Sequence, residues 1–260
     1  MQRIEIEHQG CVLWLHASGA IIWPEQATLL VADLHLGKES VFQQSGIAIP
    51  HRASSQCISR LAELIEEHGC KRVVVLGDLL HAKTGLTTSV REPLEGMVRA
   101  YAQVTWVLVA GNHDRHADRC LESLGWTVLQ PPVWESGWGW IHDPVERDKS
   151  PRDLADPGDA VTGKPTHFMA GHLHPSVAIR LGHRDTVRVP CFWIQPELIV
   201  LPAFGGWTGT HAIRPGADDR VIGCIEGRLL EISPQILAHP VRRKEGSGYH
   251  GPDGASMERP

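Results

Sequence analysis

The sequence has no long apolar run and few cysteines, and both absences restrict what the chain can be. No apolar stretch approaches the roughly 20 residues that cross a bilayer, and residues 1–9 are charged rather than signal-like. We therefore expect a soluble, cytoplasmic protein without membrane association. The six cysteines include no C-x-x-C pair, so we expect buried, reduced thiols rather than a zinc knuckle or a disulfide framework.

An excess of basic charge is also missing. The formal net charge is −5, which offers no broad basic surface for tight, sequence-independent binding of duplex DNA. This charge does not exclude a partner that carries phosphate, because divalent ions bound by acidic side chains would reverse the local potential. Any phosphate site in this chain is therefore expected to depend on metal ions.

The length and composition predict one domain. A chain of 260 residues with 42% apolar residues can bury a single sizeable core, which we place within residues 1–238. Residues 239–260 are polar and poor in aliphatic side chains, so we expect a disordered tail. Residues 143–165 form a long polar connection rich in proline and charge, and two interpretations stay open for it: a substrate loop or a solvated surface insertion.

The hydrophobic pattern predicts alternating strands and helices first and mostly strands later. A helix is expected over residues 51–69, ended by Gly69, a second from Ser89 to Tyr101, and a third over 117–124. The segment after Asp33 is expected to be a loop. Strands are expected within 2–32 and at 73–76, 106–110, 127–129, 138–141, 166–170, 176–181, 189–194, 198–201, 221–225 and 229–232. This order predicts an α/β fold in which two mixed β-sheets pack face to face and are flanked by helices.

Five short polar blocks follow apolar runs of strand length, as expected for loops beyond the carboxyl ends of sheet strands. The blocks are Asp33-Leu34-His35, Gly77-Asp78, Gly111-Asn112-His113-Asp114, His142, and Gly171-His172-Leu173-His174. They offer carboxylate, imidazole and amide ligands without a thiolate, a set that suits Mn²⁺, Fe²⁺ or Zn²⁺. A carboxylate such as Asp78 can bridge two ions. One Gly-Asp pair alone would indicate only a turn, but five blocks in strand-end context predict a dinuclear metal site.

In this order, the blocks resemble the calcineurin-like metallophosphoesterases. Within that superfamily, further segments resemble the ligase-associated, PdeM-type DNA-repair phosphoesterases: Ala32 to Lys38, then Phe42, Gly46 and Pro50, then Gly171 to Pro175, and Leu201 to Gly205. The resemblance extends from about residue 10 to about residue 232. It implies a bacterial intracellular phosphodiesterase or endonuclease, a substrate class that composition and spacing do not show.

The resemblance also implies a ligand set. Asp33, His35 and His174 would hold the first metal, Asn112, His142 and His172 the second, and Asp78 would bridge them. Two ions at ~3.5–4 Å can lower the pKa of a water molecule between them and clamp the phosphate oxygens, so the expected nucleophile is water. His142 is the least secure ligand, because His116 and His167 compete for its place. We favour His142 because it alone ends an apolar run between the third and fifth blocks.

Five further residues have expected roles around this site. His113 directly follows Asn112, so its ring should face the leaving group and act as general acid or stabilise the departing oxygen. Asp114 is expected to orient that imidazole. Lys38 and Arg115 lie beside ligand blocks and could contact substrate phosphates, although a solvated charge is the commoner outcome. Trp207 could stack on a nucleobase, although such a residue is more often part of the core.

The leading hypothesis is an Mn²⁺-dependent phosphodiesterase, an endonuclease acting on single-stranded or damaged DNA in DNA repair. The DNA substrate follows from the resemblance, which also implies a DNA ligase, a helicase and an exonuclease as partners. The first alternative is hydrolysis of a small phosphodiester or a phosphomonoester by the same metals. An open groove with basic residues would favour a polymer, and a closed cup a small molecule. A scaffold with a vestigial site is a more distant alternative, and the presence of both Asp33 and Asp78 argues against it.

Overall fold

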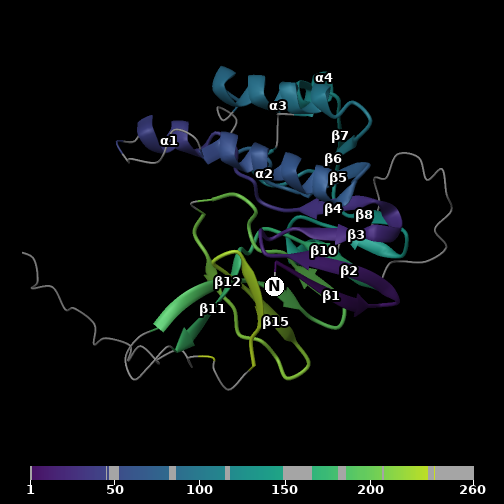
Figure 1. Cartoon of the computed structure of the whole chain (residues 1–260), viewed down its shortest axis with the longest axis vertical. Coiled ribbons are helices and arrows are strands. Elements are labelled where there is room, and N and C mark those ends of the chain that lie inside the picture. The colour runs from purple at the N-terminus through teal and green to yellow at the C-terminus, as the bar shows by residue number, and fades with distance from the viewer. Residues whose placement is uncertain are drawn as a thin grey trace, which may run out of the picture.

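The computed structural model describes residues 2–44, 46, 53–81, 86–114, 118–148, 166–180, 186–206, 208–233 and 237. Two β-sheets lie face to face, with helices on one side of the pair (Figure 1). The helices are α1 Lys38–Gln44, α2 Ala53–His68, α3 Thr88–Ala100 and α4 Asp118–Ser123. No helix in the described ranges is long and apolar enough to span a bilayer. The predicted tail over 239–260 lies outside these ranges.

The first sheet has seven strands in sequence order. They are β1 Arg3–His8, β2 Cys11–His16, β3 Ile21–Trp23, β4 Thr28–Val31, β5 Arg72–Leu76, β6 Thr105–Val109 and β7 Trp126–Leu129, with the short 3₁₀ helix η1 Pro24–Gln26 before β4. The strands from β1 to β4 pair antiparallel, and those from β4 to β7 pair parallel. Apolar, β-branched residues fill β5 because parallel strands are covered on both faces.

The second sheet has nine strands and also mixes both pairings. They are β8 Val133–Glu135, β9 Trp138–Trp140, β10 His167–Ala170, β11 Pro175–Arg180, β12 Thr186–Ile194, β13 Leu198–Val200, β14 His211–Ala212, β15 Arg220–Ile225 and β16 Arg228–Glu231, with the 3₁₀ helix η3 Pro144–Asp148 after β9. In its centre, β10 pairs parallel with both β9 and β13. Their carboxyl ends therefore point in one direction.

Two apolar layers hold the elements together. Trp138, Trp140 and Phe192 are among the buried residues between the two sheets. On the other face of the first sheet, Leu61 of α2 and Leu94 of α3 belong to a second cluster between the sheet and the helices. This sandwich with flanking helices confirms the fold class predicted from the sequence.

Some short elements differ from the predictions. Residues Lys38–Gln44 form the helix α1 where a loop was expected, because their polar sequence has no apolar period that would reveal a helix. The edge strands β8 and β14 are only three and two residues long and were not expected. The second predicted helix begins at Thr88 rather than Ser89, with Thr87 as its N-cap residue.

Candidate metal centre

The loops that carry the five polar blocks meet at the carboxyl ends of strands from both sheets. The first three blocks follow β4, β5 and β6, which are parallel neighbours. In the second sheet, the parallel strands β9 and β10 deliver His142 and the segment 171–174. The backbone N–H of Asp33 donates to the carbonyl of Gly77 at 3.1 Å, and the backbone N–H of His172 donates to Oδ2 of Asp33 at 2.8 Å. Blocks far apart in the sequence therefore form one site.

The side chains at these loops make two groups whose potential ligand atoms lie within 4.8 Å of one another. The first group is Asp33, His35 and His174. Nε2 of His174 lies 3.2 Å from Nε2 of His35 and 3.4 Å from Oδ1 of Asp33. The members coincide with the predicted ligands of the first metal.

The second group is Asp78, His142 and His172. Nε2 of His142 lies 3.1 Å from Nδ1 of His172 and 3.4 Å from Oδ1 of Asp78. The other carboxylate oxygen of Asp78 lies 4.0 Å from Nε2 of His35, which belongs to the first group. Asp78 therefore belongs to the second group and also faces the first, as a bridging carboxylate would have to do.

The buried oxygen and nitrogen atoms of the two groups are better suited to binding cations than to hydrogen bonding with one another. The side chains of Asp33 and Asp78 are almost completely buried, and a buried carboxylate is costly without a compensating charge or hydrogen bonds. Within the described part of the chain, Oδ1 of Asp33 and Nδ1 of His35 are buried without a hydrogen-bond partner. Divalent ions held by the two groups would compensate these buried charges.

Backbone conformation distinguishes the same residues. Five of the seven predicted ligands have positive φ angles, from 45° to 68°, a backbone conformation that residues other than glycine rarely adopt. They are Asp33, His35, Asp78, His172 and His174. Left-handed backbone at a non-glycine residue persists only where the surrounding structure enforces it, and it clusters at functional sites. The loops therefore hold these side chains inward at a cost in stability.

Glycines in the blocks make room for the ligands. A Cβ atom on Gly77, whose φ is +78°, would lie 2.1 Å from Nδ1 of His142. A Cβ atom on Gly111 would lie 2.4 Å from Oδ1 of Asp78. Only glycine lets the backbone of these loops approach the facing side chains so closely.

Two imidazoles of the first group have shifted pKa values. Burial, with the neighbouring His174 and Lys38, lowers the pKa of His35 to about 2, so this ring is neutral as a metal ligand must be. For His174, burial also acts to lower the pKa, but the nearby negative charge of the Asp33 carboxylate outweighs it and the pKa is raised. The shift at His174 records its close contact with a buried carboxylate.

The calcineurin-like phosphoesterase family model matches residues 27–187. The chain belongs to this family. It is therefore a metal-dependent phosphoesterase, and the resemblance drawn from its five blocks is confirmed.

Among solved structures, this calcineurin-like phosphoesterase is similar to the nuclease MPE from Pseudomonas putida. The two are 31% identical with a TM-score of 0.70, and the match covers 88% of this chain and 100% of that one. The phosphoesterase YfcE from E. coli matches at 17% identity and a TM-score of 0.36, over 76% of this chain and 88% of that one. No curated protein matches the sequence.

His142 lies in one of the two groups of potential ligands in this calcineurin-like phosphoesterase, whereas His167, its described competitor, does not. His167 begins β10 at the end opposite to the 171–174 block, and its Nε2 contacts the hydroxyl of Thr166 at 2.9 Å. His116 lies outside the described residues. The geometry thus favours the choice of His142 that the sequence suggested.

His113 lies at the open side of the site. Its side chain is 46% exposed, and its Nε2 lies 3.8 Å from Oδ2 of Asp78. Its ring stacks on His81, with centroids 5.6 Å apart and an interplanar angle of 14°. Its backbone N–H donates to Oδ1 of Asp78 at 3.0 Å. Asn112, predicted as a ligand, is exposed on the same turn.

Asp114 has different contacts from those expected. Its carboxylate accepts the backbone N–H groups of Gly111 at 2.9 Å and Leu80 at 3.1 Å. Burial raises the pKa of this carboxyl to about 6, against the opposing effect of the two N–H groups. These contacts join the loop of the third block to the loop after β5, so we correct the expectation that Asp114 orients the His113 ring. The sequence could not show this because Leu80 comes from another loop.

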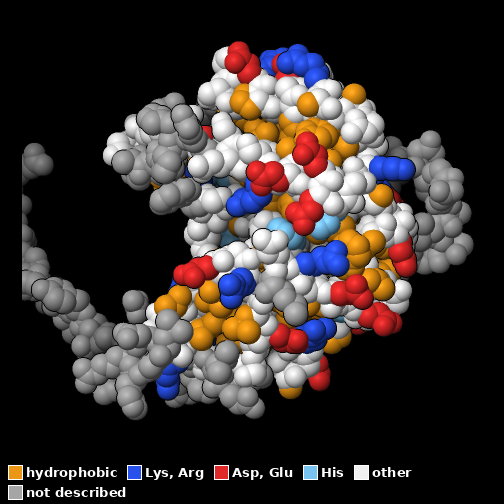
Figure 2. Space-filling view, in the orientation of Figure 1, with side chains coloured by type: hydrophobic (Ala, Val, Ile, Leu, Met, Phe, Trp, Pro, Cys, Tyr) orange, Lys and Arg blue, Asp and Glu red, His pale blue; other side chains and the backbone are white. Residues whose placement is uncertain are grey.

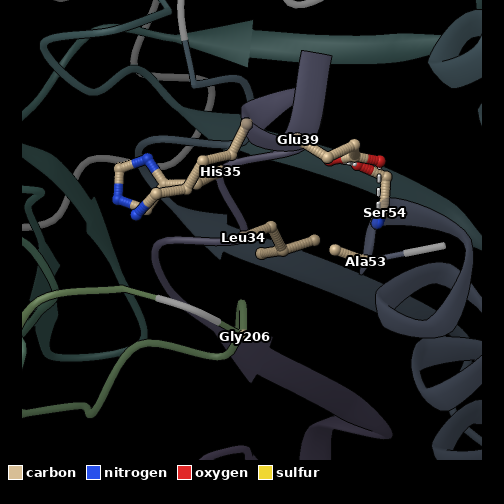
Figure 3. A pocket seen from close by; sticks show the side chains of 7 residues that line it. Leu34, His35, Glu39, Ala53, Ser54 and Gly206 are labelled. Atoms are coloured by element: carbon tan, nitrogen blue, oxygen red, sulfur yellow. Dashed lines mark hydrogen bonds between the residues drawn. The ribbon is translucent and has the colours of Figure 1, made fainter. Parts of the chain in front are cut away.

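Lys38 lies beside the centre in a pocket that α1 and α2 share. Glu39 and Ser54 point toward one another at one end of this pocket, and the ring of His35 lies at the other end (Figure 3). The Ser54 hydroxyl donates to Oε2 of Glu39 at 2.8 Å, and the Ser54 backbone N–H donates to Oε1 at 3.1 Å. Burial lowers the pKa of Lys38. The pair Glu39 and Ser54 therefore fixes the helix that presents Lys38.

Three further predictions lie outside the described residues: the substrate contact of Arg115, the stacking of Trp207, and most of the 143–165 loop. Two residues at the start of that loop were missed as parts of the site. Oδ2 of Asp143 lies 3.5 Å from Nε2 of His172. A carboxylate oxygen of Glu146 accepts the backbone N–H groups of His142 and Asp143, both at 3.1 Å. The sequence could have indicated that Asp143 and Glu146 belong to the site, because both closely follow His142.

Proposed function

We propose that this phosphoesterase hydrolyses phosphodiester bonds of nucleic acid, acting as an endonuclease on DNA in DNA repair. The proposal rests on the two groups of Asp and His side chains together with the similarity to a nuclease. That similarity is 31% identity over 88% of this chain. The seven predicted ligands are proposed to hold two divalent ions, with Asp78 between them.

The surface beside the centre supports a polymeric substrate. Leu173, which lies between two predicted ligands, lines an open hollow of about 530 Å³ together with Trp193 and Arg214. Trp193 is half-buried and Arg214 is exposed. An aromatic face and a cation next to a phosphate site are the features with which proteins hold single-stranded nucleic acid. An open hollow also suits a chain that continues beyond the reacting phosphate.

Different residues of the proposed centre have different roles in the reaction. When bound, two divalent ions neutralise the charge that develops on the phosphoryl oxygens and lower the pKa of water. The neutral ring of His35 and the buried carboxylates of Asp33 and Asp78 provide their ligands. In this proposal His113, exposed and 3.8 Å from Asp78, gives a proton from Nε2 to the departing oxygen. Lys38, which lines a pocket with His35, contacts a non-bridging phosphate oxygen in the same proposal.

The donor set also guides the choice of metal. Four imidazoles, two carboxylates and one amide without thiolate suit Mn²⁺, with Fe²⁺ or Zn²⁺ as alternatives. We further propose a cytoplasmic location, a catalytic domain within residues 1–238, and association with a DNA ligase, a helicase and an exonuclease. These last proposals rest on the resemblance to the ligase-associated phosphoesterases.

Two substrates test the proposed function. The purified chain with Mn²⁺ should hydrolyse bis-p-nitrophenyl phosphate and should also cut circular single-stranded DNA. Asp78→Ala should abolish both activities. Hydrolysis of the small ester without cutting of DNA would instead favour a small-molecule esterase. Inactivity on both substrates with Mn²⁺, Fe²⁺ and Zn²⁺ would contradict the proposal and favour a scaffold.

A further inference from the structure

A third group of potential metal ligands lies apart from the five blocks, where α2 ends beside β2. His16 is the last residue of β2, and Glu67 and His68 are the last two residues of α2. One potential ligand atom from each of the three lies within 4.8 Å of the other two. Figure 2 shows histidine side chains reaching the surface among acidic and basic side chains where the helices meet the strands.

The ring of His68 has an unused nitrogen in this group. Its side chain is only 6% exposed, and Nε2 is buried without a hydrogen-bond partner in the described part of the chain. This nitrogen lies 3.9 Å from Oε1 of Glu67, which is too far for a hydrogen bond. Two ligands each about 2.0–2.2 Å from zinc lie at most about 4.4 Å apart, so this separation fits two ligands of one ion.

The ring of His16 is held with one nitrogen left over. Its Nδ1 lies 2.8 Å from the hydroxyl of Ser18, which fixes the orientation of the ring. The backbone N–H of Ser18 also donates to this Nδ1, at 3.2 Å, so a bound ion would require the other tautomer, in which Nδ1 donates its proton to the Ser18 hydroxyl and Nε2 carries the lone pair. Burial lowers the pKa of both His16 and His68 despite the opposing charge of Glu67, so both rings are neutral ligands.

Glu67 is the third potential ligand of this group and the one that carries a negative charge. Its side chain is 57% exposed, so it can rotate to close the remaining distance to an ion. The guanidinium of Arg3, stacked 3.9 Å above the ring of Trp14, and that of Arg60 place positive charge near the two histidines. Glu67 is the carboxylate that offsets this charge, so ion binding should depend strongly on it.

We propose that His16, Glu67 and His68 bind a divalent ion of the zinc class, separate from the catalytic pair. Two imidazoles and one carboxylate, with a coordination position left for water, form a donor set that zinc commonly takes. The ion would join the carboxyl end of α2 to the end of β2. This proposed zinc site does not depend on the proposed nuclease activity.

The test is a zinc titration of the full chain after removal of metals with a chelator, followed by calorimetry and metal analysis. Glu67→Gln should weaken one zinc site at least tenfold, and His68→Gln should bind one zinc ion fewer than the parent. Glu63→Gln makes the same charge change at an exposed position of α2 and should leave zinc binding unchanged. Mn²⁺-dependent hydrolysis should stay within about twofold of the parent in Glu67→Gln.

The catalytic pair can be tested separately in the same assay. Asp78→Ala should lose catalytic metal but keep the zinc ion that Glu67→Gln weakens. If the parent, Glu67→Gln and Glu63→Gln bind equal numbers of zinc ions with equal affinities, the three residues form only a packing contact. That result would overturn the proposal, whether or not the chain proves to be a nuclease.

Discussion

At the scale of single residues, the centre combines buried charge with unfavourable backbone. His172 illustrates this, because its φ is 68° while its side chain is 34% exposed, more than that of the other four predicted ligands with positive φ. The left-handed conformation costs roughly 1–2 kcal/mol for a residue with a Cβ atom. The protein therefore gives up stability to direct ligands inward, as is common at functional sites.

A pair of substitutions at His172 measures this cost. In metal-free protein, His172→Gly should be more stable than His172→Ala by about 0.5–1 kcal/mol, because glycine relieves the backbone strain but gains entropy in the unfolded chain. Urea unfolding with a chelator present measures the difference. Equal stability of the two variants would show that the loop is not strained at this position.

His113 carries the second residue-scale prediction. His113→Ala should keep the metal content of the parent and lose about 10²–10⁴-fold in turnover on DNA, whose leaving oxygen needs a proton. The loss should be smaller on bis-p-nitrophenyl phosphate, whose leaving group departs unprotonated. His167→Ala, at the far end of β10, is the control and should retain activity. A His113→Ala enzyme with full turnover on DNA would remove this residue from the acid role.

At the scale of elements, α1 depends on a contact rather than on its own sequence. The buried carboxylate of Glu39 accepts two hydrogen bonds from Ser54 at the start of α2. Glu39→Ala should destabilise the protein by about 1–3 kcal/mol, because it leaves a buried N–H group unpaired. It should also raise KM, because Lys38 loses its fixed position.

Chemical unfolding and steady-state kinetics check both effects. Glu63→Ala, at an exposed position of α2, should change stability by no more than about 0.5 kcal/mol. An unchanged KM in a folded Glu39→Ala enzyme would contradict the role of α1 in presenting Lys38.

The same scale explains what the sequence could predict. Apolar runs followed by polar blocks identified β4, β5, β6 and β10 because buried parallel strands have a strong local signal. The helix α1 and the edge strands β8 and β14 were missed because contacts from elsewhere in the chain form them. The contacts of Asp114 with Leu80, and the approach of His16 to His68, depend on distant segments meeting. No local sequence pattern predicts such long-range contacts.

At the scale of the whole molecule, the two sheets bring the two halves of the centre together. Asp33 and Asp78 come from the first sheet, and His142 and His172 from the second. The sandwich is thus closed at one end by buried carboxylates that face imidazoles across the interface. Bound ions should therefore stabilise the contact between the sheets as well as the site.

Removal of metal tests this coupling. A chelator should lower the midpoint of thermal unfolding, because ions that bind only the folded state stabilise it by mass action. Asp78→Asn should reduce this difference between metal-bound and metal-free protein. An unfolding midpoint that is the same with Mn²⁺ and with chelator would indicate that the ions do not join the two sheets.

The proposed chemistry depends above all on Asp78 holding two divalent ions side by side. The most direct measurement is anomalous diffraction at the manganese edge from crystals grown with excess Mn²⁺. We expect two manganese peaks on either side of the Asp78 carboxylate, one beside Asp33, His35 and His174 and the other beside His142 and His172. A single peak, or none, at this carboxylate would contradict the proposal.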